Sequence, residues 1–148
     1  LILPLSLFGA AEKEYFDFNF DGHLDYRIVS FQNAKGTEFD VYLYQPGSSD
    51  YQKNEVLSGT VYPWPDQKLK QVICIWNGAH AGALFSGEVY EWNGQSFELK
   101  YFVRQDNVLV DGESHYILVK SKVVDGRSHI IEIRQGDQMW DDKGKHIE

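Results

Sequence analysis

The sequence predicts a single all-β domain, and three observations support this fold class. Runs of β-branched and aromatic residues, several with apolar and polar residues in alternation, recur along the chain. Short clusters rich in Gly, Asn, Asp and Ser separate these runs. No segment of helical length repeats apolar residues at about every 3.6 positions. We therefore expect about seven or eight strands, connected mainly as antiparallel hairpins.

The expected strands follow one another at short and regular spacing, with turn-forming residues between them. The best hairpin signal is Asn93-Gly94, which lies between two apolar runs. Asp125-Gly126 predicts a second hairpin for the same reason. In chain order, the expected strands cover residues 24–32, 38–45, 69–77, 87–94, 96–105, 114–124 and 128–135.

The middle of the chain carries signals that interrupt this pattern. Segment 49–59 has room for one helical turn. Pro63 and Pro65 exclude a central strand around them, because each proline removes a backbone donor. Cys74 is the one cysteine of the chain and lies in the apolar run "QVICIW", so we expect a buried structural thiol. Cysteine usage therefore does not indicate a cellular compartment.

The first residues read like the end of a secretory signal. "LILPLSLFGAAEKE" passes from an apolar stretch to small residues and then to charge, with a cleavage site at residues 9–11. We therefore expect residues 1–11 to be a signal-peptide remnant, residues 12–148 to be one all-β domain, and the protein to be periplasmic or secreted. The alternative is a first β-strand, and the stretch is too short to span a bilayer.

Composition limits the class of partner. The formal net charge is -8 and the pI is ≈ 5.0, which argues against nucleic-acid binding because that function needs a basic face. Hydrophobic residues make up 43% of the chain, which is typical of a globular protein. The acidity is compatible with cations and basic protein partners, although solubility alone is an alternative explanation.

Residues 15–28, "YFDFNFDGHLDYRI", place acidic or amide side chains at alternate positions before a glycine. Calcium takes six to eight oxygen ligands, and a loop supplies them when alternate side chains converge around a sharp bend. Gly22 suits that bend because glycine adopts a positive φ at little cost. Phe18, Phe20 and Leu24 are expected to anchor the loop to the core. The expected Ca²⁺ ligands are the side-chain oxygens of Asp17, Asn19, Asp21 and Asp25 and the backbone carbonyl of His23.

This spacing is EF-hand-like only in its first part. Ile28 stands where an EF-hand has its closing Glu, and the flanking residues are strand-like, so Asp25 has to close the site. Three carboxylates and one amide suit Ca²⁺ at roughly micromolar to millimolar affinity, whereas Mg²⁺ demands a tighter octahedron. The alternative is an acidic turn that binds nothing, since Asp, Asn and Gly are also turn formers.

Four segments occur in the order found in a group of bacterial periplasmic proteins: "DFNFDGHLDYRI", "FDVYLYQP", "VYPWPDQKLKQVICIW" and "VYEWNGQSFEL". Over residues 15–105 the chain resembles the FG-GAP-like immunity proteins, which inhibit lysozyme-like bacteriolytic effectors delivered by secretion systems. The calcium loop is the most specific part of this resemblance, and integrin-type FG-GAP repeats and dockerins share it. The resemblance implies a propeller-like or partial-propeller arrangement of antiparallel hairpins, bound calcium, a periplasmic location and a protein-binding role.

The expected function is therefore that of an exported calcium-binding inhibitor of a basic, secreted cell-wall hydrolase. An acidic inhibitor would be drawn to a basic enzyme by long-range attraction. Tyr42 and Tyr44 alternate with apolar residues and should point away from the core. Asp50 and Tyr51, in the loop "QPGSSDYQKN", could present an acidic and aromatic tip suited to a basic cleft, and the alternative is a plain polar loop. The alternative is a calcium-dependent adhesive or carbohydrate-binding module whose exposed aromatic residues contact the ligand.

No catalytic role is expected. The sequence has no Gly-x-Ser-x-Gly motif, and nothing in it orients His80 toward a nucleophile. His115 and His129 could face each other across a hairpin, but two ligands fall short of the three or four that zinc takes. No pair of carboxylates is singled out for glycoside hydrolysis.

Overall fold

The computed structural model describes residues 11–34, 36–77 and 84–136. These residues form eleven strands and no helix, so the predicted all-β class is confirmed. They contain no helix long and apolar enough to cross a membrane. The strands are β1 (Glu14–Phe16), β2 (Asp25–Asn33), β3 (Gly36–Gln45), β4 (Asp50–Lys53), β5 (Thr60–Val61), β6 (Trp64–Asp66), β7 (Gln71–Asn77), β8 (Phe85–Trp92), β9 (Phe97–Val110), β10 (Glu113–Val124) and β11 (Arg127–Gly136).

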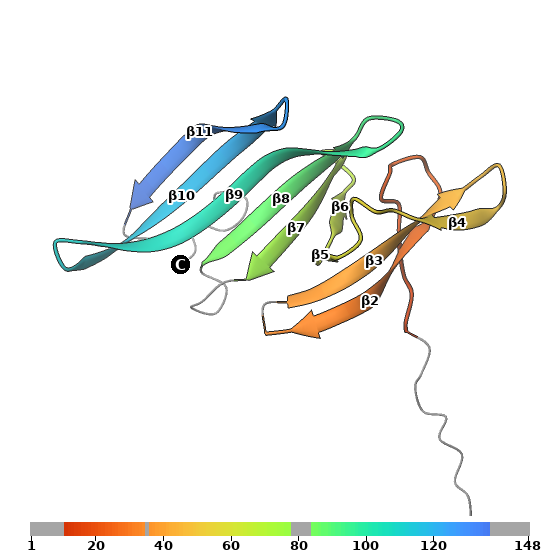
Figure 1. Cartoon of the computed structure of the whole chain (residues 1–148), viewed down its shortest axis with the longest axis horizontal. Coiled ribbons are helices and arrows are strands. Elements are labelled where there is room, and N and C mark those ends of the chain that lie inside the picture. The colour runs from red at the N-terminus through yellow and green to blue at the C-terminus, as the bar shows by residue number, and fades with distance from the viewer. Residues whose placement is uncertain (1–10, 35, 78–83, 137–148) are drawn as a thin grey trace, which may run out of the picture.

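The strands form two sheets in which every neighbouring pair is antiparallel (Figure 1). The smaller sheet has the order β1-β2-β3-β4, with β5 paired to β3. The larger sheet is a six-stranded meander of consecutive hairpins in the order β11-β10-β9-β8-β7-β6. The described residues do not complete a propeller, so the propeller-like part of the expected fold remains a prediction.

All seven expected strands are present and both predicted hairpins are confirmed, but the count of seven or eight strands was too low, because four short strands, β1, β4, β5 and β6, were not predicted. Asp125 and Gly126 form a two-residue turn with φ of 50° and 71°. The other hairpin has a longer turn, residues 93–96 between the paired Trp92 and Phe97, in which Gly94 has φ 96°. The segment 49–59 does not form a helix, because it consists of β4 followed by a turn. The Ser58 N–H donates to the Asn54 carbonyl there, at 3.0 Å, as a single isolated helical-type bond.

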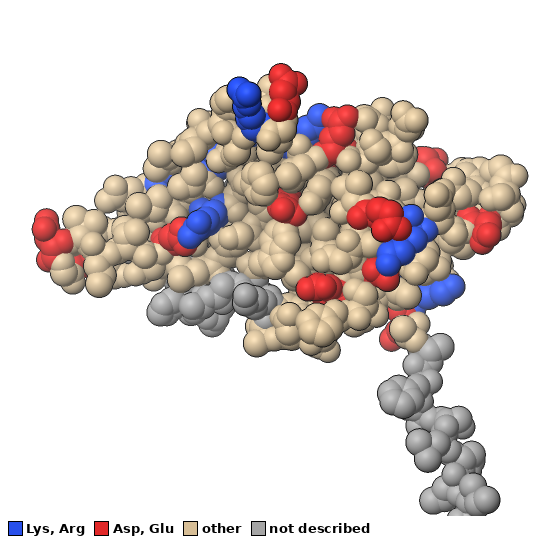
Figure 2. Space-filling view, in the orientation of Figure 1, with Lys and Arg blue, Asp and Glu red and all other residues tan. Residues whose placement is uncertain are grey.

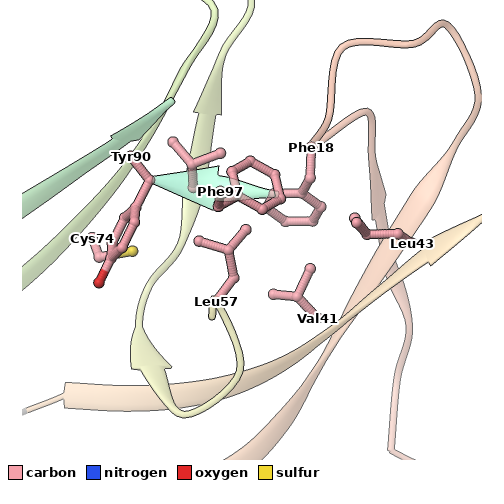
Figure 3. Close-up of a cluster of buried hydrophobic side chains, with 8 residues drawn as sticks. Phe18, Val41, Leu43, Leu57, Cys74, Tyr90 and Phe97 are labelled. Atoms are coloured by element: carbon pink, nitrogen blue, oxygen red, sulfur yellow. The ribbon is translucent and has the colours of Figure 1, made fainter. Parts of the chain in front are cut away.

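The core lies between the two sheets and joins them (Figure 3). β3 supplies buried side chains at every second position, while the larger sheet contributes residues of β7, β8 and β9. Cys74 is fully buried, which raises the pKa of its thiol to about 12, so the predicted structural thiol is confirmed. The buried members of the core are Phe18, Val41, Leu43, Leu57, Val72, Cys74, Tyr90 and Phe97.

Several expectations fall on residues outside the described part of the chain. The signal-peptide remnant at residues 1–11 lies almost wholly there, as does His80. Pro65 lies within β6, a three-residue strand at the edge of the larger sheet, and this agrees with the exclusion of a central strand at the prolines.

Candidate functional site

The predicted calcium loop connects β1 to β2. Phe16 pairs with Asp25 across the two strands, so the loop begins and ends at neighbouring points of the sheet. Gly22 has φ 88°, as predicted for the bend, and Phe20 also has a positive φ of 62°. Phe18 is buried in the core and Phe20 packs against it, which confirms two of the three expected anchors. Leu24 is exposed, so the third anchor was predicted wrongly.

Three of the predicted ligands turn toward the same bend of the loop. The Asp17 carboxylate accepts the backbone N–H groups of Asp21 at 3.1 Å and Gly22 at 3.0 Å. The Asn19 Oδ1 also accepts the Asp21 N–H, at 3.3 Å, and its Nδ2 donates to the Asp21 carboxylate at 3.0 Å. The side-chain oxygens of Asp17, Asn19 and Asp21 therefore converge inside one turn of the backbone.

Asp25 is placed differently, because it is completely buried with 0% exposure. Its Oδ2 accepts the backbone N–H groups of Phe18 at 2.8 Å and Asn19 at 3.4 Å. Its Oδ1 accepts the backbone N–H of Tyr44 on β3, at 2.8 Å. Burial raises the pKa of this carboxyl to about 6, although the three N–H donors favour the charged form. Asp25 therefore fastens the loop to the sheet, a role that the sequence did not reveal.

The donor set suits calcium in kind, since it consists of oxygen atoms from carboxylates, an amide and a backbone carbonyl. A carboxylate oxygen that accepts one N–H keeps a further lone pair for a cation. In the described residues, no group of three or more His, Cys, Asp and Glu is arranged to hold a metal ion. Calcium binding by Asp17, Asn19, Asp21, His23 and Asp25 therefore remains a prediction.

A surface rich in tyrosine adjoins this loop on the outer side of the smaller sheet. We call it the tyrosine face, and its members are Tyr15, Tyr26, Tyr42, Tyr44 and Tyr51. Tyr42 and Tyr44 alternate with buried residues of β3 and point outward, as predicted. The ring of Tyr26 lies 4.8 Å from those of both Tyr42 and Tyr51. The rings therefore form a continuous aromatic cluster, in which Tyr26 is buried and the other four tyrosines are at least partly exposed.

The structure corrects the predicted position of Asp50 and Tyr51, and it places His23 beside the tyrosine face. Asp50 and Tyr51 do not form a loop tip, because they are the first residues of β4, where Tyr51 pairs with Tyr44. The imidazole of His23 stacks on Tyr44, with 5.3 Å between ring centroids. The His23 N–H and ring nitrogen both contact Asp21, at 2.8 and 3.2 Å. His23 therefore connects the acidic loop to the tyrosine face.

A polar groove of about 520 Å³ runs between the loop, the β3–β4 hairpin and the β8–β9 turn. Its walls combine acidic, amide and aromatic side chains, and these include Asp21, Tyr44, Gln52, Trp92 and Gln95. Amides and carboxylates bond well to hydroxyl groups, and aromatic rings pack against the faces of sugar rings. The groove therefore suits a polar ligand such as a saccharide or an extended peptide.

The remaining histidines do not form a site in the described residues. His115 lies opposite Val108 and His129 lies opposite Lys122, so the two imidazoles do not face each other across the hairpin. This removes the geometric basis for a zinc pair.

Comparison with known proteins gives one result at the level of the fold. No family model matches the chain, and no curated protein matches it. A solved structure of a Xanthomonas Type IV secretion system related protein is similar, with a TM-score of 0.60 and 15% sequence identity. The likeness covers 80% of this chain and 56% of the length of that protein. At this identity the likeness shows the fold alone.

Proposed function

We propose that this protein is an exported, calcium-binding inhibitor of a lysozyme-like bacteriolytic effector. The observation that carries the proposal is the fold shared with a Type IV secretion system related protein. The sequence points in the same direction, because residues 15–105 resemble FG-GAP-like immunity proteins that inhibit effectors delivered by secretion systems. The role is one of binding, with no catalytic step.

The tyrosine face is the surface that we assign to the effector. Tyrosine is enriched at the energetic centres of protein interfaces, because its ring is large and rigid and carries a hydroxyl group. The Lys13 ammonium already lies 4.3 Å from the centroid of the Tyr26 ring, so the face is suited to cations. A basic hydrolase would offer Lys and Arg side chains to the same rings.

Electrostatic attraction supports a basic partner. The net charge of -8 speeds encounter with a positively charged protein. Acidic and basic side chains lie scattered over the side of the molecule shown in Figure 2, so the attraction there comes from the overall charge and not from one acidic patch. Asp21 and Asp50 lie near the tyrosine face. The pKa of the Tyr26 hydroxyl is raised, mainly by burial and to a lesser extent by neighbouring groups that include the Asp50 carboxylate.

Calcium would stabilise the loop beside this surface. Asp17, Asn19 and Asp21 would hold the ion together with the His23 carbonyl and Asp25, and the ion would neutralise carboxylates that the fold brings close together. Since His23 stacks on Tyr44, a fixed loop also fixes one edge of the tyrosine face.

Calcium at ten to one hundred times its dissociation constant is expected to raise the free energy of unfolding by about 1–3 kcal/mol. The measurement is thermal unfolding with excess Ca²⁺ and with EGTA. Asp17→Ala should abolish the difference, whereas Asp50→Ala, which removes a carboxylate outside the loop, should keep it. A midpoint of the wild-type protein that EGTA leaves unchanged would count against calcium binding.

Inhibition of a lysozyme-type hydrolase by the purified protein tests the proposed function. Tyr44→Ala combined with Tyr51→Ala should weaken inhibition at least about tenfold, because truncating an interface tyrosine typically costs more than about 1 kcal/mol. Phe31→Ala is the matched control, since it removes an exposed aromatic residue outside the tyrosine face. Full inhibition by the double variant would exclude this face as the binding surface.

The second candidate function is carbohydrate binding, and the polar groove beside Asp21 favours it. A carbohydrate-binding module would be retained on peptidoglycan or a polysaccharide column and would not inhibit lysis. Gln52→Ala and Gln95→Ala should weaken that retention, because both amides line the groove.

A further inference from the structure

The edges of the two sheets differ sharply in how they are protected. β1 and β6 have three residues each and β4 has four, and β6 also contains Pro65. Short edge strands and proline are common devices against pairing with another chain. β11 is the other edge of the larger sheet, and it has ten residues and no proline. In the described part of the chain its one neighbour is β10.

β11 also exposes large apolar side chains. Ile130, Ile131 and Ile133 are 62%, 53% and 63% exposed. Ile133 pairs with Val119 of β10, and Ile130 pairs with Ser121 of β10. Ser121 in turn pairs with Phe102 of β9. These five residues therefore lie on one face of the sheet. The smaller sheet lies over the opposite end of the meander and does not reach β11 (Figure 1).

A concave surface continues from this edge across the same face of the sheet. A hollow of about 480 Å³ is lined by both apolar and charged side chains, among them Phe102, Val119, Arg104 and Asp106. In the described part of the chain, β11 is a long edge strand with exposed isoleucines, an arrangement that natural monomers avoid because its backbone N–H and C=O groups can pair with a further strand.

We propose that β11 pairs in antiparallel fashion with β11 of a second copy of this chain, so that two six-stranded sheets become one continuous sheet. The order of side chains along the strand is self-complementary about Ile133. With a two-fold axis there, Ile133 lies against Ile133 of the partner subunit. Glu132 then lies opposite Arg134 of the partner subunit, and the symmetric contact repeats this pair.

The geometry and local charge of β11 suit this pairing. The irregularity of the β10–β11 register lies at Ile131, because Lys120 pairs with Glu132 and Ser121 pairs with Ile130. With the two-fold axis at Ile133, the residues from Glu132 to Arg134 of both copies lie in the regular part of this register. Glu132 and Arg134 contact each other within one chain and can exchange partners across the axis. With two arginines, at 127 and 134, against one glutamate, the edge lacks the acidity of the whole chain.

Sedimentation of the full chain over a concentration series tests the pairing, in the absence of any hydrolase. The wild-type protein should form a dimer. Ile133→Lys places two like charges on the axis and should weaken dimerisation at least about tenfold. This residue is exposed, so near-UV circular dichroism should show an unchanged fold. Leu109→Lys, at a still more exposed position on β9, is the control and should leave the dimer intact, because β10 lies between β9 and β11.

A charge exchange tests the register. Glu132→Arg and Arg134→Glu should each weaken the dimer roughly tenfold, because like charges then lie opposite each other twice. The variant carrying both changes should recover the wild-type dissociation constant. A protein that stays monomeric at every concentration would overturn the proposal, and so would a dimer that Ile133→Lys leaves unchanged. These results do not depend on the proposed function, because the measurement needs neither calcium nor an effector.

Discussion

Replacing Asp25 by alanine lowers the free energy of unfolding by about 3–5 kcal/mol, measured by urea denaturation in EGTA. The carboxylate accepts backbone N–H groups from Phe18, Asn19 and Tyr44, and it is completely buried. Each buried donor that loses its acceptor costs about 1–3 kcal/mol, because alanine leaves no oxygen in its place. The loop then detaches from β3.

Asp40→Ala is the matched control. Asp40 is also a sheet carboxylate, and its Oδ2 pairs with Lys53 at 2.9 Å on the exposed side of the same sheet. Exposed ion pairs contribute little, so this variant should unfold at nearly the wild-type urea concentration. Equal losses in the two variants would show that the buried N–H groups are not the cause.

The pH dependence gives a second readout of Asp25. Burial raises the pKa of this carboxyl from 3.8 to about 6. The folded protein therefore binds a proton more tightly than the unfolded chain, and the contribution of this group to stability falls as the pH rises from about 4 to about 6. The Asp25→Asn variant has no titrating group at this position. The free energy of unfolding of the wild type, relative to that of Asp25→Asn, should therefore increase as the pH falls from about 6 to about 4. A difference that stays constant with pH would contradict the buried, proton-binding state.

Asp25 also shows where prediction from the sequence stops. Its place at the end of an alternating acidic run indicates a metal ligand, and that pattern is local. Its bond to the Tyr44 N–H depends on β2 lying beside β3 in one register, which no short window of sequence records. The hairpin at Asp125-Gly126 could be predicted because two adjacent residues determine the turn. β5 could not, since its two residues are held by pairing with β3.

In the tyrosine face, too, local pattern predicts some residues and strand pairing determines the others. The alternation in β3 correctly predicts that Tyr42 and Tyr44 point outward. Tyr15 and Tyr51 join them only because β1 and β4 complete the sheet, and both strands are too short to show a pattern of their own. As a result, the sequence placed Tyr51 on a loop, whereas the structure places it in a strand.

Arg27 is the second residue whose role depends on the assembled sheet, and Arg27→Ala should lower the free energy of unfolding by about 3–4 kcal/mol. Its side chain is almost fully buried, at 5% exposure of the residue. The guanidinium donates to the Glu14 carboxylate at 2.6 and 2.9 Å and to the Pro63 carbonyl at 2.6 Å. Three aromatic rings also surround it, those of Phe16, Phe39 and Trp64.

These contacts explain why the loss should be large. Arg27 joins β1, through Glu14, to the connector that precedes β6, through Pro63, and no backbone pairing links those two segments. Alanine would leave the Pro63 carbonyl without its donor and open a cavity among the rings. Arg27→Lys keeps the charge but cannot direct donors at both oxygens, so it should lose about half as much stability.

Glu14→Gln tests the ion pair between Glu14 and Arg27 separately from the contacts of Arg27 with the Pro63 carbonyl and the aromatic rings. Glu14 is partly exposed, with 42% of its side chain accessible, so water replaces much of what the carboxylate provides. Urea denaturation should therefore show a loss below about 1 kcal/mol for Glu14→Gln, well short of the loss for Arg27→Ala. If the two variants lose equal stability, the ion pair alone holds the junction, and the rings and the Pro63 carbonyl contribute nothing. The predicted inequality follows from burial, because the guanidinium lies in the interior while its acidic partner reaches solvent.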